Sequence, residues 1–238
     1  GLTYFSNIMP NWWGLIADLD TALENKYIVQ LSTSPLIAHW SLDNLNDSSG
    51  NGFSIMALDA EGESTLDSVV GVSGNAANFT KPVVDKYRLS VIKGTPLYSN
   101  LRPGSFTIMA YVKRNDTACN YNYCAIFSKG SSGSQGYSFG IVNNKVHLRI
   151  NDNQNTSATG ITELQNNNWY HVAGTYDAET GSLKVYINGI LDGSSTDLDP
   201  INYEDAEVVI GNANDGYDLP FRGVIDEVKF FDRALTLQ

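Results

Sequence analysis

From Leu36 onward, apolar and polar residues alternate in short segments separated by turns, and this alternation limits the possible folds more than any other feature. A period of two is typical of a β-strand that buries one face. In residues 145–151, for example, Val146, Leu148 and Ile150 fall on one face and charged residues fall on the other. Such segments recur about every ten residues with no helical pattern between them, which predicts an all-β, two-sheet antiparallel sandwich.

The strands expected from this pattern are joined by recognisable turns. Asn188-Gly189 is the strongest hairpin signal, and Asn143-Asn144 is a second one. Trp40 and Trp169 lie inside expected strands, so both are expected in the core. The expected strands are 36–42, 69–79, 87–92, 105–112, 124–129, 137–142, 145–151, 169–176, 182–188, 190–191, 207–211 and 223–231.

Residues 1–35 follow a different pattern. Apolar side chains there recur at spacings of three and four, which predicts a helix over roughly residues 12–26 with Asn11 as its N-cap. We expect residues 1–35 to be an N-terminal helical extension and residues 36–238 to be one domain. The preferred partner for the apolar face is the sandwich itself, over a neighbouring domain or a second copy. The face comprises Trp12, Ile16, Leu19, Leu23 and Tyr27.

The formal net charge of −11 argues against strongly anionic partners. An acidic surface repels phosphate backbones and anionic membranes, so no nucleic-acid partner is expected. No run of eighteen apolar residues is present, so no membrane insertion is expected either. Acidic oxygens suit calcium, although most of these carboxylates are explained by solubility alone.

Two cysteines, Cys119 and Cys124, are the only ones in the chain. The four residues between them are enough to close a small loop, and a disulfide is favoured over two free thiols. A disulfide indicates an oxidising compartment, and the chain begins without a signal-peptide pattern. We therefore expect an extracellular or cell-surface protein that is either mature or one module of a larger chain. Sequons at Asn46, Asn78, Asn115 and Asn155 agree with that setting.

Five segments, in order along the chain, resemble the core strands of laminin-G-like jelly rolls. The resemblance implies a concanavalin-A-like jelly-roll sandwich across roughly residues 36–237, a fold that hosts binding domains and enzymes alike. The segments are Gly71-Val-Ser-Gly-Asn-Ala-Ala-Asn-Phe79, Pro103-Gly-Ser-Phe-Thr-Ile-Met-Ala-Tyr-Val112, Asn168-Trp-Tyr-His-Val-Ala-Gly-Thr-Tyr-Asp177, Leu183-Lys-Val-Tyr-Ile-Asn-Gly189 and Gly223-Val-Ile-Asp-Glu-Val-Lys-Phe-Phe-Asp-Arg-Ala-Leu235.

The resemblance also implies a structural calcium ion. In related folds, the aspartate that matches Asp226 ligates calcium together with groups from the turn after the first strand. Here that turn supplies Asp43, Asp47 and Asn51 as oxygen donors. The alternative is a turn whose side chains cap its own backbone.

Ligand binding is expected at two loops that combine aromatic and polar side chains, because sugars stack on aromatic rings and need a few fixed polar groups. One loop, enclosed by the cysteines, carries Tyr121 and Tyr123. The alternative is that these aromatic rings cover the ends of the sheets. The other loop carries Asn212, Asn214, Asp215 and Tyr217.

No catalytic motif is found. Glucanases of this architecture carry Glu-x-Asp-x-x-Glu, which places two carboxylates across the scissile bond, and this string is absent. His39, His147 and His171 lie within strand patterns and are expected to be structural. The sequence thus predicts a non-catalytic carbohydrate-binding or adhesion module with a structural calcium ion. A protein-binding laminin-G-like domain is the second hypothesis, and a polysaccharide hydrolase or lyase is the third.

Overall fold

The computed structural model describes residues 36–80, 86–92, 98–115, 119, 122–130, 135–151, 157–203, 205–213 and 219–236. The helix expected over residues 12–26 lies outside these residues. Within the described part of the chain, the 3-10 turn η2 (Tyr98–Leu101) is the helical element described over its full length, and no described helix is long and apolar enough to cross a membrane.

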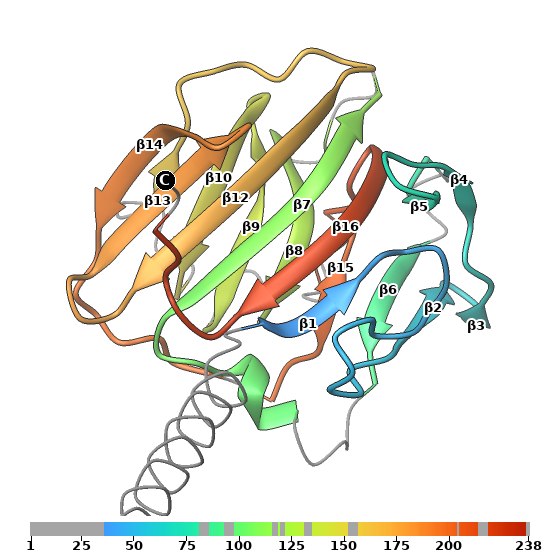
Figure 1. Ribbon diagram of the computed structural model, residues 1–238, viewed down its shortest axis with the longest axis horizontal. Helices are drawn as coiled ribbons and strands as arrows, with labels where there is room; N and C mark the ends of the chain where they lie inside the picture. Colours follow the sequence, from blue (N-terminus) through green and yellow to red (C-terminus); the bar gives the residue numbers. More distant parts are fainter. Residues whose placement is uncertain are drawn as a thin grey trace, which may run out of the picture. The chain divides into compact units, whose positions relative to one another are not determined.

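Two antiparallel sheets form the sandwich that the alternation predicts (Figure 1). The first sheet has the order β14 (Ile190–Thr196), β13 (Ser182–Ile187), β12 (Trp169–Asp177), β7 (Phe106–Arg114), β16 (Gly223–Phe231), β5 (Asn75–Asn78) and β4 (Ser68–Val70), with β1 (Leu36–Trp40) also on β16. The second has the order β11 (Ala158–Thr159), β10 (Lys145–Ile150), β9 (Tyr137–Val142), β8 (Tyr123–Lys129), β15 (Val208–Ile210), β6 (Arg88–Val91), β2 (Ile55–Asp59) and β3 (Gly62–Ser64).

Aromatic side chains fill the centre of the core between the sheets. The rings of Phe106 and Tyr137 lie 4.7 Å apart between centroids, and those of Phe127 and Phe230 lie 5.7 Å apart. Trp40 is buried against Phe127 as expected, and its indole N–H donates to the carbonyl of Phe53 at 2.6 Å. Because such rings each bury a large apolar area, this cluster contributes much of the hydrophobic stabilisation.

Both expected hairpin turns are present. Asn143 and Asn144 join β9 to β10 with φ of 48° and 68°, and Asn188 and Gly189 join β13 to β14 with φ of 51° and 81°. Two successive positive φ angles define the type I′ turn, whose twist matches that of the strands it joins. Asparagine and glycine tolerate this conformation better than other residues do.

The strand expected over residues 69–79 is instead a hairpin made of β4 and β5. Its turn includes Gly74 with φ of 62°, and the Gly71 N–H donates to the Gly74 carbonyl at 3.0 Å. Alternation alone missed this turn because apolar residues continue on both sides of it. β2, β3 and β11 were also not expected, since each is short and has little apolar alternation.

Candidate functional site

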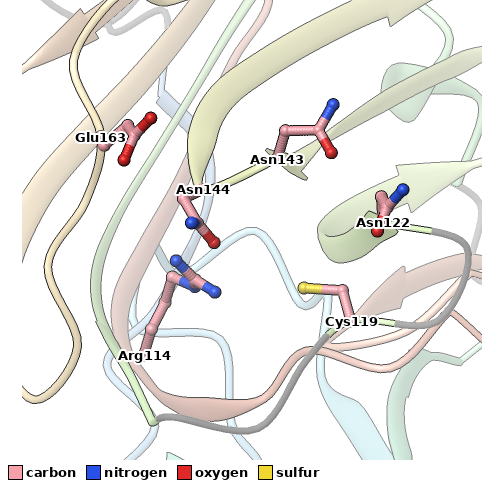
Figure 2. A pocket seen from close by; sticks show the side chains of 6 residues that line it. All are labelled: Arg114, Cys119, Asn122, Asn143, Asn144 and Glu163. Carbon is pink, nitrogen blue, oxygen red and sulfur yellow. The ribbon is translucent and has the colours of Figure 1, made fainter.

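A pocket of about 350 Å³ lies at the end of the sandwich where β7 finishes and the β9–β10 hairpin turns (Figure 2). Its described lining combines amides, a guanidinium group and a carboxylate and contains no aromatic ring. These groups come from segments far apart in the sequence that the sheet topology brings together. The lining residues are Arg114, Cys119, Asn122, Asn143, Asn144 and Glu163.

The asparagines of the pocket are held by backbone hydrogen bonds. The Asn143 N–H donates to the carbonyl of Asn122 at 3.2 Å, and the Leu164 N–H donates to the carbonyl of Asn144 at 2.8 Å. Asn122 also has a positive φ, of 60°. The hairpin turn is therefore tied to the neighbouring segment on each side, which limits how far the amide side chains can move.

The predicted disulfide between Cys119 and Cys124 is confirmed, with a Cα–Cα separation of 5.2 Å. Cys124 is buried in β8, whereas Cys119 lines the pocket. A disulfide restricts the conformations of the residues between its cysteines, because it closes them into a covalent ring. The disulfide thus fixes one wall of the pocket to the second sheet.

Arg114 is the last residue of β7 and lies on the core-facing side of that strand, in phase with Ile108, Ala110 and Val112. It is only 6 % exposed, and its guanidinium group points into the pocket toward Asn144 (Figure 2). One guanidinium nitrogen donates to the carbonyl of Leu164 at 3.4 Å. Burial lowers the pKa of Arg114, although guanidinium groups stay protonated in proteins.

Sequence reasoning missed Arg114 because it ended the expected strand at Val112. Two further residues of alternation would have placed an arginine on an inward-facing position, which is unusual enough to mark a site. Glu163 lies in an irregular segment, and no sequence signal identified it.

The first predicted ligand-binding loop is described only in part, since Tyr121 lies outside the described residues. Tyr123 is buried in β8, and its hydroxyl is hydrogen-bonded to that of Ser138. The guanidinium group of Arg149 lies 5.2 Å from the centroid of its ring, and the ring of His147 meets it edge-on at 6.0 Å. The Tyr123 ring is therefore packed against protein and does not line the pocket.

The second predicted loop is described at its two ends, and Asn214, Asp215 and Tyr217 lie outside the described residues. Asn212 is 1 % exposed, and its side-chain oxygen accepts hydrogen bonds from the N–H groups of Ala213 and Leu219. It therefore ties the two ends of the loop together. The structure brings the two predicted loops into contact, since Ala213 and Leu219 pack against Tyr123.

The four residues predicted to bind calcium fall into two pairs. Asp43, in the turn after β1, and Asp226, on β16, both contact the β4–β5 hairpin: the Asn75 N–H donates to Asp43, and the Val72 and Ser73 N–H groups donate to Asp226. The second carboxylate oxygen of Asp226 is buried and has no hydrogen-bond partner. Burial raises the pKa of Asp226 despite hydrogen bonds that lower it.

Asp47 and Asn51 form the other pair and hold the turn after β1 together. The Asp47 carboxylate accepts the N–H groups of His39, Ser49 and Phe53 and the hydroxyl of Ser49, at 2.7 to 3.0 Å. Burial raises the pKa of Asp47, but these hydrogen bonds lower it more. Asn51 donates to the carbonyls of Leu36 and Ile37.

The donor set therefore fits calcium in part. The unpartnered oxygen of Asp226 has the chemistry of a cation ligand, and Asp43 contacts the same hairpin, whereas Asp47 is saturated by protein donors. No group of three or more histidine, cysteine, aspartate and glutamate side chains with metal-binding geometry occurs in the described ranges.

Trp169 corrects one expectation, because it is only partly buried. It lies opposite Lys113 in the β7–β12 pairing, on the outward-facing phase, and the ammonium group of Lys113 lies 5.0 Å from its ring centroid.

His147, also on an outward-facing position, is hydrogen-bonded to the Thr159 hydroxyl at 2.9 Å. Burial, followed by the charge of Arg149, lowers the pKa of His147 to about 4.

The chain is similar to known proteins in sequence profile and in fold. Residues 92–238 match the family described as the concanavalin A-like lectin/glucanases superfamily. No curated protein matches the chain. Domain 4 of AbnA, a GH43 extracellular arabinanase from Geobacillus stearothermophilus solved with arabinotriose, aligns with a TM-score of 0.63 and 24 % identity over 84 % of this chain and 94 % of that one.

Toxin domains share the fold at lower identity. The binding domain of botulinum neurotoxin DC, solved in complex with SialylT, aligns with a TM-score of 0.62 and 17 % identity over 85 % of this chain. The same binding domain solved with rat synaptotagmin II aligns with the same TM-score, identity and coverage. In both cases the alignment covers 49 % of the toxin chain, so this chain spans about half of those domains.

Proposed function

The chain belongs to the concanavalin A-like lectin/glucanase superfamily, and from this membership and the pocket we propose that it is a non-catalytic carbohydrate-binding module that acts outside the cell. The disulfide supports an oxidising, extracellular setting. The absence of the glucanase carboxylate string supports a binding role over a catalytic one.

The observation that carries this proposal is the chemistry of the pocket lining. Sugar hydroxyl groups both donate and accept hydrogen bonds, and amide, guanidinium and carboxylate groups supply the complementary partners. Asn122, Asn143 and Asn144 present amides from backbone positions that are already fixed, so less entropy is lost on binding. A volume of about 350 Å³ lies within the usual range for small-molecule sites.

The similar structures support the same conclusion. The arabinanase domain was solved with an arabinose trisaccharide, and the toxin binding domain with SialylT. The fold thus carries domains found with glycans, although it does not place a sugar on any residue of this chain.

A glycan array probed with the purified chain tests the proposal. We expect binding to a related set of glycans, and we expect Asn144→Gly to weaken it, because glycine keeps the turn conformation but removes the amide. Asn188→Gly, in the other type I′ turn, is the matched control and is expected to bind as the wild type does. A folded chain that binds no glycan, or that degrades a polysaccharide, contradicts the proposal.

Calcium remains part of the proposal as a structural ion. Asp43 and Asp226 would hold it beside the β4–β5 turn, where it would neutralise the buried carboxylate of Asp226. Such an ion acts by stabilising the folded chain and does not need to touch the ligand.

A protein partner is the second candidate function, and one surface favours it. Ile190 and Leu191 of β14 are 73 % and 52 % exposed, and Ile161 lies nearby, with its N–H donating to the carbonyl of Asp192. Exposed apolar groups of this kind at a sheet edge are typical of interaction surfaces. If a protein is the partner, Leu191→Asp should abolish its binding and leave glycan binding unchanged.

A further inference from the structure

Arg114 is a buried cation that the described protein does not neutralise. Its Nε has no hydrogen-bond partner, and the described residues form no ion pair with it. A charge removed from water is costly unless another charge or several hydrogen bonds replace the lost solvation. The single 3.4 Å contact to the Leu164 carbonyl is a weak replacement.

A second buried cation in the same molecule, Lys129, has interactions that replace its lost solvation. Lys129 is 1 % exposed, and its ammonium group donates to the carbonyl of Ala206 at 2.9 Å. The same group lies 4.8 Å from the ring centroid of Tyr98, within the range of a cation–π interaction. The fold can therefore provide close partners for a buried cation, whereas the described residues give Arg114 only the 3.4 Å contact to the Leu164 carbonyl.

The position of Arg114 directs the end of its guanidinium group toward the pocket, whereas Nε itself is buried. Its guanidinium group points into the pocket, where Asn122, Asn143 and Asn144 present amides (Figure 2). A planar guanidinium group matches a carboxylate in two parallel hydrogen bonds, and the amides match hydroxyl groups. One cation beside several amides is the complement of one carboxylate beside several hydroxyls.

We propose that the pocket binds a sugar that carries a carboxylate, such as a uronic acid, with the carboxylate on Arg114 and the ring hydroxyls on the asparagine amides. This inference rests on the proposed carbohydrate-binding function and names the class of its ligand. The net charge of −11 and the carboxylate of Glu163 at the pocket repel densely sulfated chains. A short oligosaccharide with a single carboxylate at the site fits one cation better.

The test compares acidic oligosaccharides with their own neutral forms. The full chain is titrated by calorimetry with galacturonate, glucuronate, mannuronate and guluronate trisaccharides and with the same sugars after carboxyl reduction. We expect at least one uronate series to bind, with affinity falling about tenfold or more on reduction. Binding to uronates should also weaken as salt is raised.

Three variants locate the effect. Arg114→Gln is expected to lose the preference for the acidic form, and Glu163→Gln, at an exposed residue, to bind uronates severalfold more tightly because a repelling charge is removed. Arg102→Gln is the matched control, since it removes an arginine that forms an exposed ion pair with Asp205 away from the pocket. If Arg114→Gln fails to fold, Glu163→Gln alone still carries the test.

Failure of the inference is distinct from failure of the proposed function. Equal binding of the acidic and reduced sugars, or no gain in Glu163→Gln, overturns the inference and leaves a neutral-sugar module. Binding to sulfated glycans alone also overturns it. No binding to any acidic, reduced or neutral glycan overturns the proposed function together with the inference.

Discussion

Two charged residues on neighbouring strands, Arg114 on β7 and Asp226 on β16, are buried in different ways. Gly223 of β16 pairs with Arg114, and Asp226, three residues later, pairs with Tyr111. Asp226 accepts hydrogen bonds from two backbone N–H groups of the β4–β5 turn, whereas Arg114 donates one long hydrogen bond, to the Leu164 carbonyl. The chain therefore stabilises the Asp226 carboxylate largely by its own hydrogen bonds, whereas the Arg114 guanidinium group faces a pocket.

The difference follows from what backbone turns can offer. A tight turn presents several N–H groups in one direction, so a single carboxylate can accept them all. A guanidinium group needs acceptors spread around a plane, which one turn rarely supplies. A buried carboxylate is thus easily made structural, and a buried arginine at a pocket indicates an anionic ligand.

Asp47→Ala gives the largest effect that this comparison predicts. Its carboxylate accepts hydrogen bonds from three backbone N–H groups, and removing it leaves the buried donor of Phe53 without a partner. We expect a loss of about 3 kcal/mol in the free energy of unfolding, measured by urea denaturation. Asp47→Asn is the control and should lose less, because it retains one acceptor. A loss below about 1 kcal/mol in Asp47→Ala would show that the carboxylate is not structural.

Calcium binding at Asp226 is expected to raise the stability of the folded chain. Burial raises the pKa of this carboxylate in the metal-free chain, so its ionised form lowers stability as the pH rises through that pKa. A bound cation removes this penalty, and at a hundredfold excess over its Kd it should add about 3 kcal/mol. The measurement is the Tm with calcium and with EDTA at neutral pH. Asp226→Asn should abolish the calcium effect, whereas equal Tm values for the wild type in both buffers would exclude the ion.

His147 is a buried side chain that stays neutral, and it predicts that the stability of the chain depends on pH. Its pKa in the folded chain is about 4, below the usual 6.5, so the unfolded chain binds the proton first as the pH falls. Stability is then complete above about pH 6.5 and decreases toward pH 4, by about 3 kcal/mol. His147→Gln should reduce this slope in urea denaturation at pH 7 and pH 4.5. An unchanged slope would assign the acid sensitivity to other groups.

We expect Arg114→Met to give the smallest change in stability, in contrast to the large loss expected in Asp47→Ala. Methionine retains the apolar stem and removes an unsatisfied charge, so the free energy of unfolding should change by less than about 1 kcal/mol. Lys129→Met is the matched control and should lose about 2 kcal/mol, because it breaks the hydrogen bond to Ala206 and the contact with Tyr98. A larger loss in Arg114→Met than in Lys129→Met would make Arg114 structural.

Much of this fold follows from patterns that are local in the sequence. Strand alternation, the Asn143-Asn144 and Asn188-Gly189 turns and the cysteine pair all depend on residues that lie close together, and all were predicted. The turn at 71–74 was not, because it is held by two residues distant in the sequence, Asp43 in the turn after β1 and Asp226 on β16.

The candidate site shows the same limit more sharply. Asp47 could be named from its position in a polar turn, but whether its oxygens face a metal or backbone N–H groups depends on how the turn folds. Arg114 can be recognised as an inward-facing residue only if the alternation of β7 is continued for two residues past Val112. The pocket around it needs the topology that places the β9–β10 hairpin next to the end of β7.

Nuclear magnetic resonance of the 15N-labelled chain titrated with glucuronate and galacturonate, and with glucose and galactose as neutral controls, tests the role of Arg114 most directly. We expect the acidic sugars to shift the Arg114 Nε–H resonance and the backbone amides of Asn122, Asn143 and Asn144, with smaller shifts from the neutral sugars. Shifts confined to the turn at residues 71–75 or to the outer face around Trp169, with the Arg114 resonance unchanged, would contradict the assignment of this pocket as the binding site.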